Sequence, residues 1–263
     1  MIAAGACVYS SYYLSGGRDI GPVAWPVVFT VLVTGFGNLV NDFFDADIDR
    51  VNKPHRPIPS GRLGRGYVLR IYAVGTVLVT ALMTFVLPPA ILALMVAWEV
   101  LLFSYAARVK RVALFGNILI GAVCASAFLV GAMVAGVTGV VVFPAFFAFV
   151  FVVGREIVKG AEDIEGDRMA GARTLAVRFG VARTARWGAM VLCLGAMTAP
   201  IPALVRYFGG TYGVLMELSV VPGMLAAAYF VLRSPRKAVF SRVSWLLKIE
   251  MLAGIIAMGL GRS

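Results

Sequence analysis

The feature that most limits the possible folds is the spacing of charge along the chain. Apolar runs of about 20 residues, the length of a helix that crosses a bilayer core, are separated by short charged segments. Of the 263 residues, 60% are hydrophobic and only 14% are charged, and the mean hydropathy is +0.90. Since a soluble domain carries roughly a quarter charged residues, the sequence predicts an all-α protein that crosses a membrane many times.

We predict nine transmembrane helices in a bundle around a central cavity, forming one domain over residues 1–263. The expected helices cover 1–15, 22–44, 66–87, 90–107, 112–133, 135–160, 183–205, 212–232 and 242–261. The first run lacks the basic start and the cleavage site of a signal peptide. We expect the chain to begin inside this first helix.

Basic residues occupy every second loop between the expected helices. Of the 24 Lys and Arg residues, all except Arg18, Arg206 and Arg262 follow the second, fourth, sixth or eighth helix. The positive-inside rule places these loops in the cytoplasm. The net charge of +11 therefore reflects an integral cell-membrane protein rather than binding to nucleic acid. Three scattered cysteines and one histidine predict neither a disulfide framework nor a multi-histidine metal centre.

The carboxylates are placed just as unevenly. All but four of the 13 Asp and Glu residues lie within 42–49 or 156–167, on the predicted cytoplasmic side. In the first segment Asn41, Asp45 and Asp49 follow a four-residue spacing, which puts them on one face if the second helix continues this far. Asp42 can reach the same side. Pro54 should end the helix.

The second segment has the same four-residue spacing. Arg155, Lys159, Asp163 and Asp167 would form one polar edge of a continuous helix, cationic at its start and anionic at its end. Gly166 indicates that this helix ends near Asp167. Because Lys159 shares a face with the aspartates, we expect it to take part in catalysis.

Oxygen ligands without histidine or cysteine suit a hard cation such as Mg²⁺. Mg²⁺ is held through a few carboxylates together with substrate phosphates rather than in a closed protein cage. Two carboxylate segments on one side, with basic residues between them, therefore predict a diphosphate held through Mg²⁺. The candidate metal ligands are Asn41, Asp45, Asp49, Asp163 and Asp167.

A diphosphate at the mouth of an apolar bundle would carry a hydrocarbon chain. Ionisation of an allylic diphosphate needs cations to stabilise the leaving group, and an apolar wall that keeps water from the carbocation. Aromatic faces can stabilise such a cation, and the candidates are Phe43, Phe44, Phe103, Tyr105, Phe147 and Phe151. The loops with Arg56, Arg62 and Lys110 either fold over the diphosphate or only set the orientation.

These residues resemble the UbiA superfamily of intramembrane prenyltransferases. The family motif N-x-x-x-D-x-x-x-D matches residues 41–49, and its D-x-x-x-D motif matches 163–167 with the upstream lysine at Lys159. RPIPSGR (56–62) and SYAARVKR (104–111), followed by Asn117, are similar to two further family segments. The resemblance implies transfer of a prenyl group from a prenyl diphosphate to a lipophilic acceptor. It also implies Mg²⁺, with two ions bridging the diphosphate, and substrate binding by Asp42, Arg56, Arg62, Lys110, Asn117 and Arg155.

The segment GREIVKGAEDIEGD (154–167) is most similar to the archaeal ether-lipid branch of this family. That resemblance implies a geranylgeranyl donor, and as acceptor the free hydroxyl of geranylgeranylglyceryl phosphate. Arg155 stands where many aromatic-acceptor members have tyrosine, and an arginine suits an acceptor that carries a phosphate. Gly160 departs from this branch, in which an acidic residue is frequent. An aromatic acceptor of quinone biosynthesis is the alternative.

Two other classes of membrane protein also use carboxylates. A cation-coupled transporter places them near the midplane, often within inverted repeats, whereas these acids lie at helix ends and no repeat is visible. A phosphatidyl-alcohol transferase uses one continuous aspartate motif rather than two. Metal-dependent release of diphosphate would separate the prenyltransferase from both.

Overall fold

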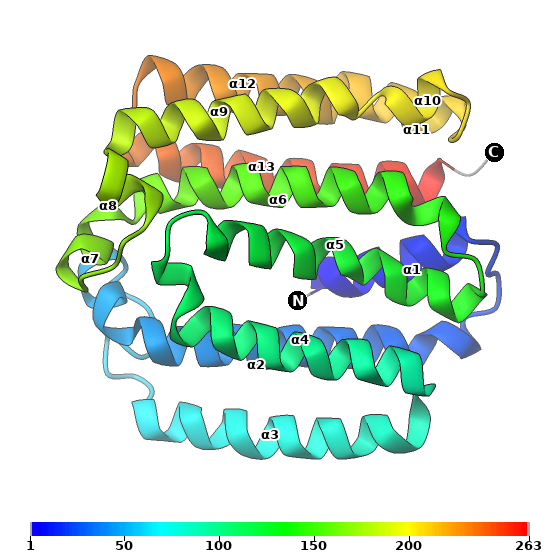
Figure 1. The fold of residues 1–263 in the computed structure, drawn as a ribbon, viewed down its shortest axis with the longest axis horizontal. Coiled ribbons are helices and arrows are strands. Elements are labelled where there is room, and N and C mark those ends of the chain that lie inside the picture. Colours follow the sequence, from blue (N-terminus) through cyan, green and yellow to red (C-terminus); the bar gives the residue numbers. More distant parts are fainter. Residues whose placement is uncertain (1, 262–263) are drawn as a thin grey trace.

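The computed structural model describes residues 2–261, so Met1 and Arg262, which carry parts of the predictions above, lie outside the described residues. Its long helices run side by side (Figure 1). They are α1 (Ile2–Leu14), α2 (Gly21–Asn52), α3 (Arg65–Val86), α4 (Pro89–Ala107), α5 (Phe115–Ala135), α6 (Val142–Glu162), α9 (Val181–Thr198), α12 (Val221–Arg233) and α13 (Lys237–Leu260). The short elements are η1 (Val109–Arg111), η2 (Gly139–Val141), α7 (Ile164–Met169), α8 (Leu175–Phe179), α10 (Ile201–Leu204), α11 (Gly210–Leu215) and the π-helix η3 (Met216–Val220).

Seven helical segments of the described chain are long and apolar enough to cross a membrane. They are Gly21–Asn52, Arg65–Val86, Pro89–Ala107, Phe115–Ala135, Val181–Leu204, Gly210–Arg233 and Lys237–Leu260. The predicted count of nine spans is not confirmed. Within residues 2–261, α1 has only 13 residues, and α6 carries Arg155, Glu156 and Lys159 in its second half. The prediction of an all-helical membrane protein is confirmed.

Two helix ends near the acidic segments differ from their predicted positions. α2 does not stop near residue 44 but continues to Asn52, so one helix carries the whole first cluster. The predicted continuous helix through Asp167 is wrong, because α6 ends at Glu162 and α7 begins at Ile164. Asp163 stands at this break, with φ −91° and ψ 6°. Its backbone leaves the helical region, and this turns α7 away from the axis of α6.

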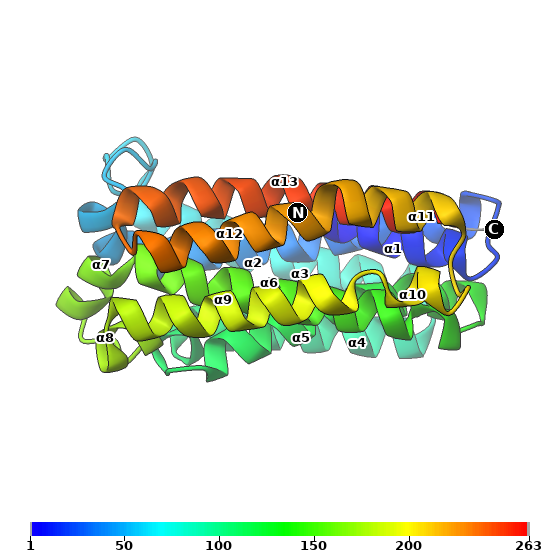
Figure 2. The ribbon, with the colours of Figure 1, turned by 90° about the horizontal axis from the view of Figure 1, so that it is seen from above.

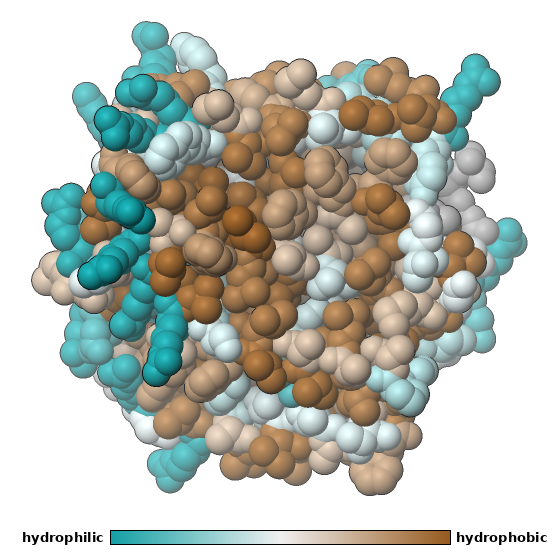
Figure 3. Space-filling model, in the orientation of Figure 1, coloured by the Kyte–Doolittle hydropathy of each residue, from teal (hydrophilic) through white to brown (hydrophobic). Residues whose placement is uncertain are grey.

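Polar side chains gather at one end of the bundle. Figure 3 shows hydrophilic groups at the end where α7 and α8 lie, and a broad apolar surface along the middle of the bundle. Figure 2 shows the same helices from above, with the loop between α2 and α3 standing out to one side of the bundle at its polar end. The apolar belt is what a lipid-facing surface requires, since hydrocarbon satisfies no polar group.

The helices pack around two hydrophobic cores. One joins α1, α2, α3, α4 and α5, with Trp98 and Met95 at its centre. The other joins α5 and α6 with α9 and the helices that follow it, and Phe151, Tyr212 and Met224 are among its fully buried members. The central cavity lies between these cores.

α1 and α5 approach so closely that a glycine is required at their contact. A Cβ atom at Gly131 would overlap the carbonyl oxygen of Val8 and the hydroxyl oxygen of Ser11. Small residues allow such close backbone approach in membrane bundles, where dispersion contacts between helices replace the hydrophobic effect. Gly131 therefore fixes the position of α1 on the bundle.

We expect Gly131→Ala to destabilise the protein by about 1–3 kcal/mol, because the added methyl group forces α1 and α5 apart. This should lower the melting temperature in detergent by several degrees, following the rough scaling of about 2–4 °C per kcal/mol. Gly66→Ala is the matched control, since Gly66 is also helical and has nothing within 4 Å of its ideal Cβ position. Equal melting temperatures for the two variants would contradict this account of the contact.

Candidate active site

The first acidic segment contributes three side chains to one polar cavity. Asn41, Asp45 and Asp49 lie on one face of α2 and all line a cavity of about 110 Å³ at the polar end. The Asn41 Nδ2 atom donates to Asp45 Oδ2 at 2.8 Å. Asp49 is 5% exposed. The four-residue spacing on the helix thus places three oxygen-bearing side chains in the wall of the same cavity.

The second acidic segment reaches the same cavity from the opposite side. Asp163 and Asp167 both line it, from the break after α6 and from α7. The amide of Asn52, at the end of α2, holds this break in place: Nδ2 donates to the Asp163 carbonyl at 3.0 Å, and Oδ1 accepts from the Gly166 N–H at 3.3 Å. A Cβ at Gly166 would overlap that amide. We call this pair of bonds the Asn52 clamp, and it brings the two aspartate clusters together.

Each cluster is paired with cations from elsewhere in the chain. Lys110 bonds to Asp45 and, at 2.9 Å, to Asn41 Oδ1. Lys53 Nζ lies 3.1 Å from Asp163 Oδ1. Arg56 Nη1 lies 2.7 Å from Asp49 Oδ2 and 3.1 Å from Asp42 Oδ1. Stacked carboxylates would repel one another, so these cations balance the charge of the site.

The loop between α4 and α5 places two cations over the cavity. Gly116 lies directly against the backbone of Lys110, and a side chain there would displace the loop. The Arg173 N–H donates to the Arg111 carbonyl at 2.8 Å, which ties the loop to the segment after α7. Arg111 lines the cavity, and its buried Nε atom has no partner among the described residues. This guanidinium group therefore has a donor free for an anion.

Burial shifts the proton affinity of two groups in the cavity that lie outside the membrane spans. Burial, together with the negative charges of Asp163 and Asp45, raises the pKa of Asp167 to about 6. Burial lowers the pKa of Lys110 from its ordinary value, against the opposing attraction of Asp45. A low-dielectric site of this kind strengthens electrostatic interactions with any bound ion.

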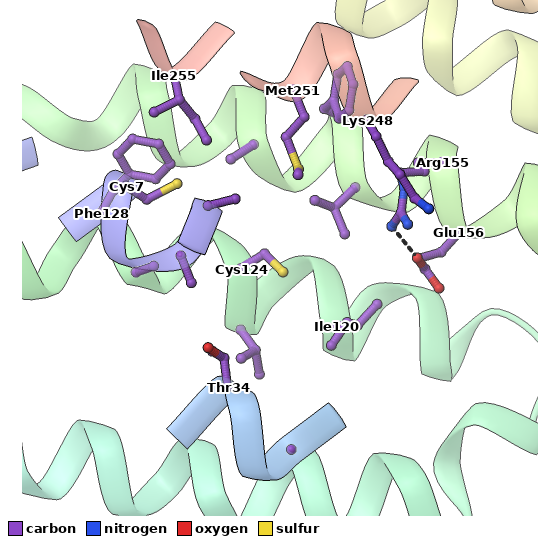
Figure 4. Close-up of a pocket in the computed structure, with 18 of the residues that line it drawn as sticks. Cys7, Thr34, Ile120, Cys124, Phe128, Arg155, Glu156, Lys248, Met251 and Ile255 are labelled. Atoms are coloured by element: carbon purple, nitrogen blue, oxygen red, sulfur yellow. Dashed lines mark hydrogen bonds and ion pairs between the residues drawn. The ribbon is translucent and has the colours of Figure 1, made fainter. Parts of the chain in front are cut away.

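A second, larger cavity of about 550 Å³ adjoins the polar one (Figure 4). Its walls are mostly apolar and come from α1, α2, α4, α5, α6 and α13. Four residues line both cavities and so mark the boundary between them: Asn41, Tyr105, Glu156 and Lys159. Three of the predicted aromatic residues face the larger cavity, namely Tyr105, Phe147 and Phe151. Phe43, Phe44 and Phe103 do not line it and pack against one another.

The structure brings most of the sequence-predicted residues together. The polar cavity is lined by Asn41, Asp45, Asp49, Arg56, Lys110, Asn117, Lys159, Asp163 and Asp167. Arg155 lines the larger cavity instead. Asp42 lines neither and contacts the site only through Arg56. Arg62 is not brought to the site, since it donates to the carbonyl of His55 and to Ser60 within its own loop.

Sequence reasoning missed four charged residues that line the cavities. They are Lys53, Arg111, Glu156 and Lys248. The sequence uses Lys53 and Arg111 only to predict membrane orientation, and it indicates no role for Glu156 beyond membership of the second acidic segment. Lys248 was counted with a basic loop, but it lies in the middle of α13. A lone lysine within an apolar span was the signal that could have identified it.

The donor set fits a metal ion that is shared with a substrate. Within residues 2–261, no three His, Cys, Asp or Glu side chains lie close enough to hold an ion by themselves. The carboxylates instead come as pairs from α2 and from the α6–α7 break, on two sides of one cavity. Mg²⁺ prefers such partial oxygen ligation, completed by waters and substrate phosphates. The unpartnered Nε of Arg111 is a further sign that an anion belongs in this cavity.

Fold and site together define an intramembrane enzyme. Its polar cavity is lined by carboxylates and cations, and the adjoining larger cavity, which we call the chamber, is mostly apolar. The sequence matches the UbiA prenyltransferase family over residues 3–250, and the chain belongs to this family. It is 37% identical over 235 residues to the digeranylgeranylglyceryl phosphate synthase of Methanothermobacter thermautotrophicus, covering 89% of this chain and 82% of that protein. The predicted resemblance and the transferase class are confirmed.

Solved structures share the same fold. A structure described as digeranylgeranylglyceryl phosphate synthase in membranes is 30% identical, with a TM-score of 0.75, and covers 99% of this chain and 93% of its own. A UbiA homolog from Archaeoglobus fulgidus bound to DMAPP and Mg²⁺ is 15% identical, with a TM-score of 0.67. That comparison covers 97% of this chain and 96% of the homolog, and it shows the fold alone.

Proposed function

We propose that the protein transfers a geranylgeranyl group from geranylgeranyl diphosphate to the free hydroxyl of geranylgeranylglyceryl phosphate. The observation that carries this proposal is the junction of an aspartate-rich polar cavity with a long apolar one. A prenyl diphosphate has the same two parts, a charged head and a hydrocarbon chain. The relatives named digeranylgeranylglyceryl phosphate synthase support the choice of acceptor.

The polar cavity would hold the diphosphate. Asn41, Asp45, Asp49, Asp163 and Asp167 would hold Mg²⁺. A UbiA homolog bound to DMAPP and Mg²⁺ supports the choice of metal, but not the choice of ligands. Mg²⁺ bound at these residues would supply Lewis-acid stabilisation of the departing diphosphate.

The cations of the cavity would bind the phosphate oxygens directly. Lys110, Arg56 and Lys53 pair with aspartates at the wall of the polar cavity, where their charges would also attract phosphate oxygens. Arg111 has a free donor and Lys159 stands at the boundary between the cavities. These groups stabilise the negative charge that grows on the leaving group.

The reaction forms one ether bond and breaks one phosphate ester bond. The C1–O bond of the donor breaks, and its electron pair leaves with the diphosphate. The acceptor hydroxyl oxygen attacks the allylic carbon and releases its proton. Tyr105, Phe147 and Phe151 line the chamber, where their faces can stabilise the cation and their bulk excludes water.

The distribution of basic residues supports an active site on the cytoplasmic side. The polar end of the bundle carries the loop between α2 and α3, which contains Arg56, and the segment between α4 and α5, which contains Lys110 (Figure 1). Loops of this composition stay in the cytoplasm by the positive-inside rule. Soluble prenyl diphosphates would then enter from that compartment.

The proposal is tested with purified protein in detergent, Mg²⁺ and radiolabelled geranylgeranyl diphosphate. One reaction contains geranylgeranylglyceryl phosphate and another contains 4-hydroxybenzoate, each with an EDTA control. We expect EDTA-sensitive product, and release of diphosphate, only with the glycerol phosphate. Product only with the aromatic acid would overturn the acceptor and favour the quinone branch. No metal-dependent release of diphosphate with either acceptor would overturn the donor assignment as well.

A further inference from the structure

The two cavities differ in how their cations are balanced. In the polar cavity Lys53, Arg56 and Lys110 each pair with an aspartate. The larger cavity is also lined by cations, but Glu156 is the one acid among its described lining residues. Its cations are Arg155, Lys159 and Lys248. The larger cavity therefore carries an excess of positive charge in the region where these charged residues lie, which we call its polar corner.

Two of these cations reach that corner from different helices. Figure 4 shows Arg155 extending from α6 and Lys248 extending from α13 toward the same region of the cavity. Their separation along the chain means that only the packing of α6 on α13 brings them together. Ser244 of α13 donates to Glu162 of α6 at 3.0 Å, which fixes this packing one turn away.

Both cations have donors that the described residues leave free. Arg155 Nη1 lies 2.6 Å from Glu156 Oε1, but its buried Nε has no hydrogen-bond partner. Lys248 is an exposed residue at the edge of the larger cavity, forms no ion pair with any described residue, and has its Nζ 4.5 Å from the centroid of the Trp245 ring. A lysine in the middle of an apolar span is costly and commonly marks a substrate or ion pathway. A buried guanidinium donor without a partner is costly for the same reason.

We propose that Arg155 and Lys248 form a second anion site that binds the phosphate monoester of the acceptor. This inference rests on the proposed function and names the groups that select its acceptor. A guanidinium group offers planar, paired donors and an ammonium group adds a compact charge, a combination that suits a phosphate. A phosphate monoester carries about −1.5 to −2 charges near neutral pH, which matches the excess charge of the chamber.

The position of the site keeps the two phosphate groups apart. Arg155 and Lys248 line only the larger cavity, whereas Asp163, Asp167 and Lys110 line only the polar one. Lys159 and Glu156 line both and stand between them. An acceptor whose phosphate lies at Arg155 and Lys248 can direct its hydroxyl toward this boundary. There it meets C1 of a donor whose diphosphate lies in the polar cavity.

The test compares two acceptors that differ only in the phosphate: geranylgeranylglyceryl phosphate and geranylgeranylglycerol. Initial rates are measured with wild type, Arg155→Gln, Lys248→Met and the charge-retaining Lys248→Arg. We expect Arg155→Gln and Lys248→Met to raise KM for the phosphorylated acceptor by about 10- to 100-fold, as for loss of a charged hydrogen bond. KM for geranylgeranyl diphosphate should change less than about 2-fold, and Lys248→Arg should restore most of the loss. Turnover of the unphosphorylated alcohol should respond little to any of the substitutions.

Arg242→Met is the matched control, because Arg242 is an exposed residue of α13 that lines neither cavity. A rise in KM for geranylgeranyl diphosphate would overturn the proposal and assign these cations to the donor. Equal losses with both acceptors, or a fall in melting temperature that parallels the loss, would assign them a structural role. Failure of wild type with the phosphorylated acceptor, despite metal-dependent turnover of another acceptor, would overturn the proposed function itself.

Discussion

Replacement of Asp45 or Asp163 by alanine should abolish prenyl transfer while the helical bundle stays folded. Each carboxylate lies in the polar cavity, on a different side of it, and each would hold Mg²⁺ against the diphosphate. Loss of one preorganised group that stabilises developing charge costs about 100- to 1000-fold in turnover. We therefore expect kcat to fall by at least about 100-fold, measured with saturating Mg²⁺ and both substrates.

Asp47→Ala is the control for this pair of variants. Asp47 lies on the same helix between Asp45 and Asp49, but its side chain is 60% exposed and pairs with Arg50 and Arg65 outside the cavity. It should keep near-wild-type turnover. The Lys53–Asp163 pair is itself partly exposed, so its loss should cost no more than about 1 kcal/mol of stability. Full activity of Asp45→Ala or Asp163→Ala would disprove the metal assignment.

Removal of Mg²⁺ should stop turnover completely and leave the melting temperature of the free protein almost unchanged. Asp45, Asp49 and Asp163 are paired with Lys110, Arg56 and Lys53, so we expect the fold to tolerate loss of the ion. Turnover after EDTA treatment should return on addition of Mg²⁺. Thermal unfolding in detergent, with and without EDTA, measures the second part of the expectation.

Ca²⁺ provides the control for ion identity. Ca²⁺ also prefers oxygen ligands, but it is larger and takes more of them. It should restore less activity than Mg²⁺ at equal concentration. Turnover that survives EDTA would refute metal-dependent catalysis, and a large fall in melting temperature with EDTA would show that the ion is structural.

The fold could be predicted from the sequence where a single physical effect decides the outcome. Apolar runs of membrane-spanning length place the long helices, and Pro54 lies two residues beyond the end of α2. The break at Asp163 could not be predicted in this way. The Asp163 N–H still bonds to the Lys159 carbonyl at 3.0 Å, and the Asp167 N–H to the Asp163 carbonyl at 3.1 Å. The four-residue spacing of residues 155–167 is therefore compatible with a continuous helix. The bend becomes evident only from the hydrogen bonds between Asn52 of α2 and the segment 163–166.

The members of the candidate site could largely be predicted from the sequence, but the individual contacts between its helices could not. Four-residue spacing places Asn41, Asp45 and Asp49 together because helical geometry requires it. The partner of Asp163 is Lys53, 110 residues away in sequence, and no periodic pattern encodes that distance. Lys248 was missed for the same reason, since its role depends on the packing of α13 against α6. Such contacts between helices depend on how all the helices pack together, which local sequence patterns do not predict.

The Asn52 clamp also has a mechanical consequence. It links α2, which belongs to one hydrophobic core, to the α6–α7 break, which adjoins the other. The two halves of the bundle are thus joined at their polar end by hydrogen bonds to the backbone of the α6–α7 break. We expect the larger cavity to widen and narrow by small movements of its helices, while the polar end stays fixed. Hydrocarbon chains of different shape can then be admitted while the spacing between the two aspartate clusters stays constant.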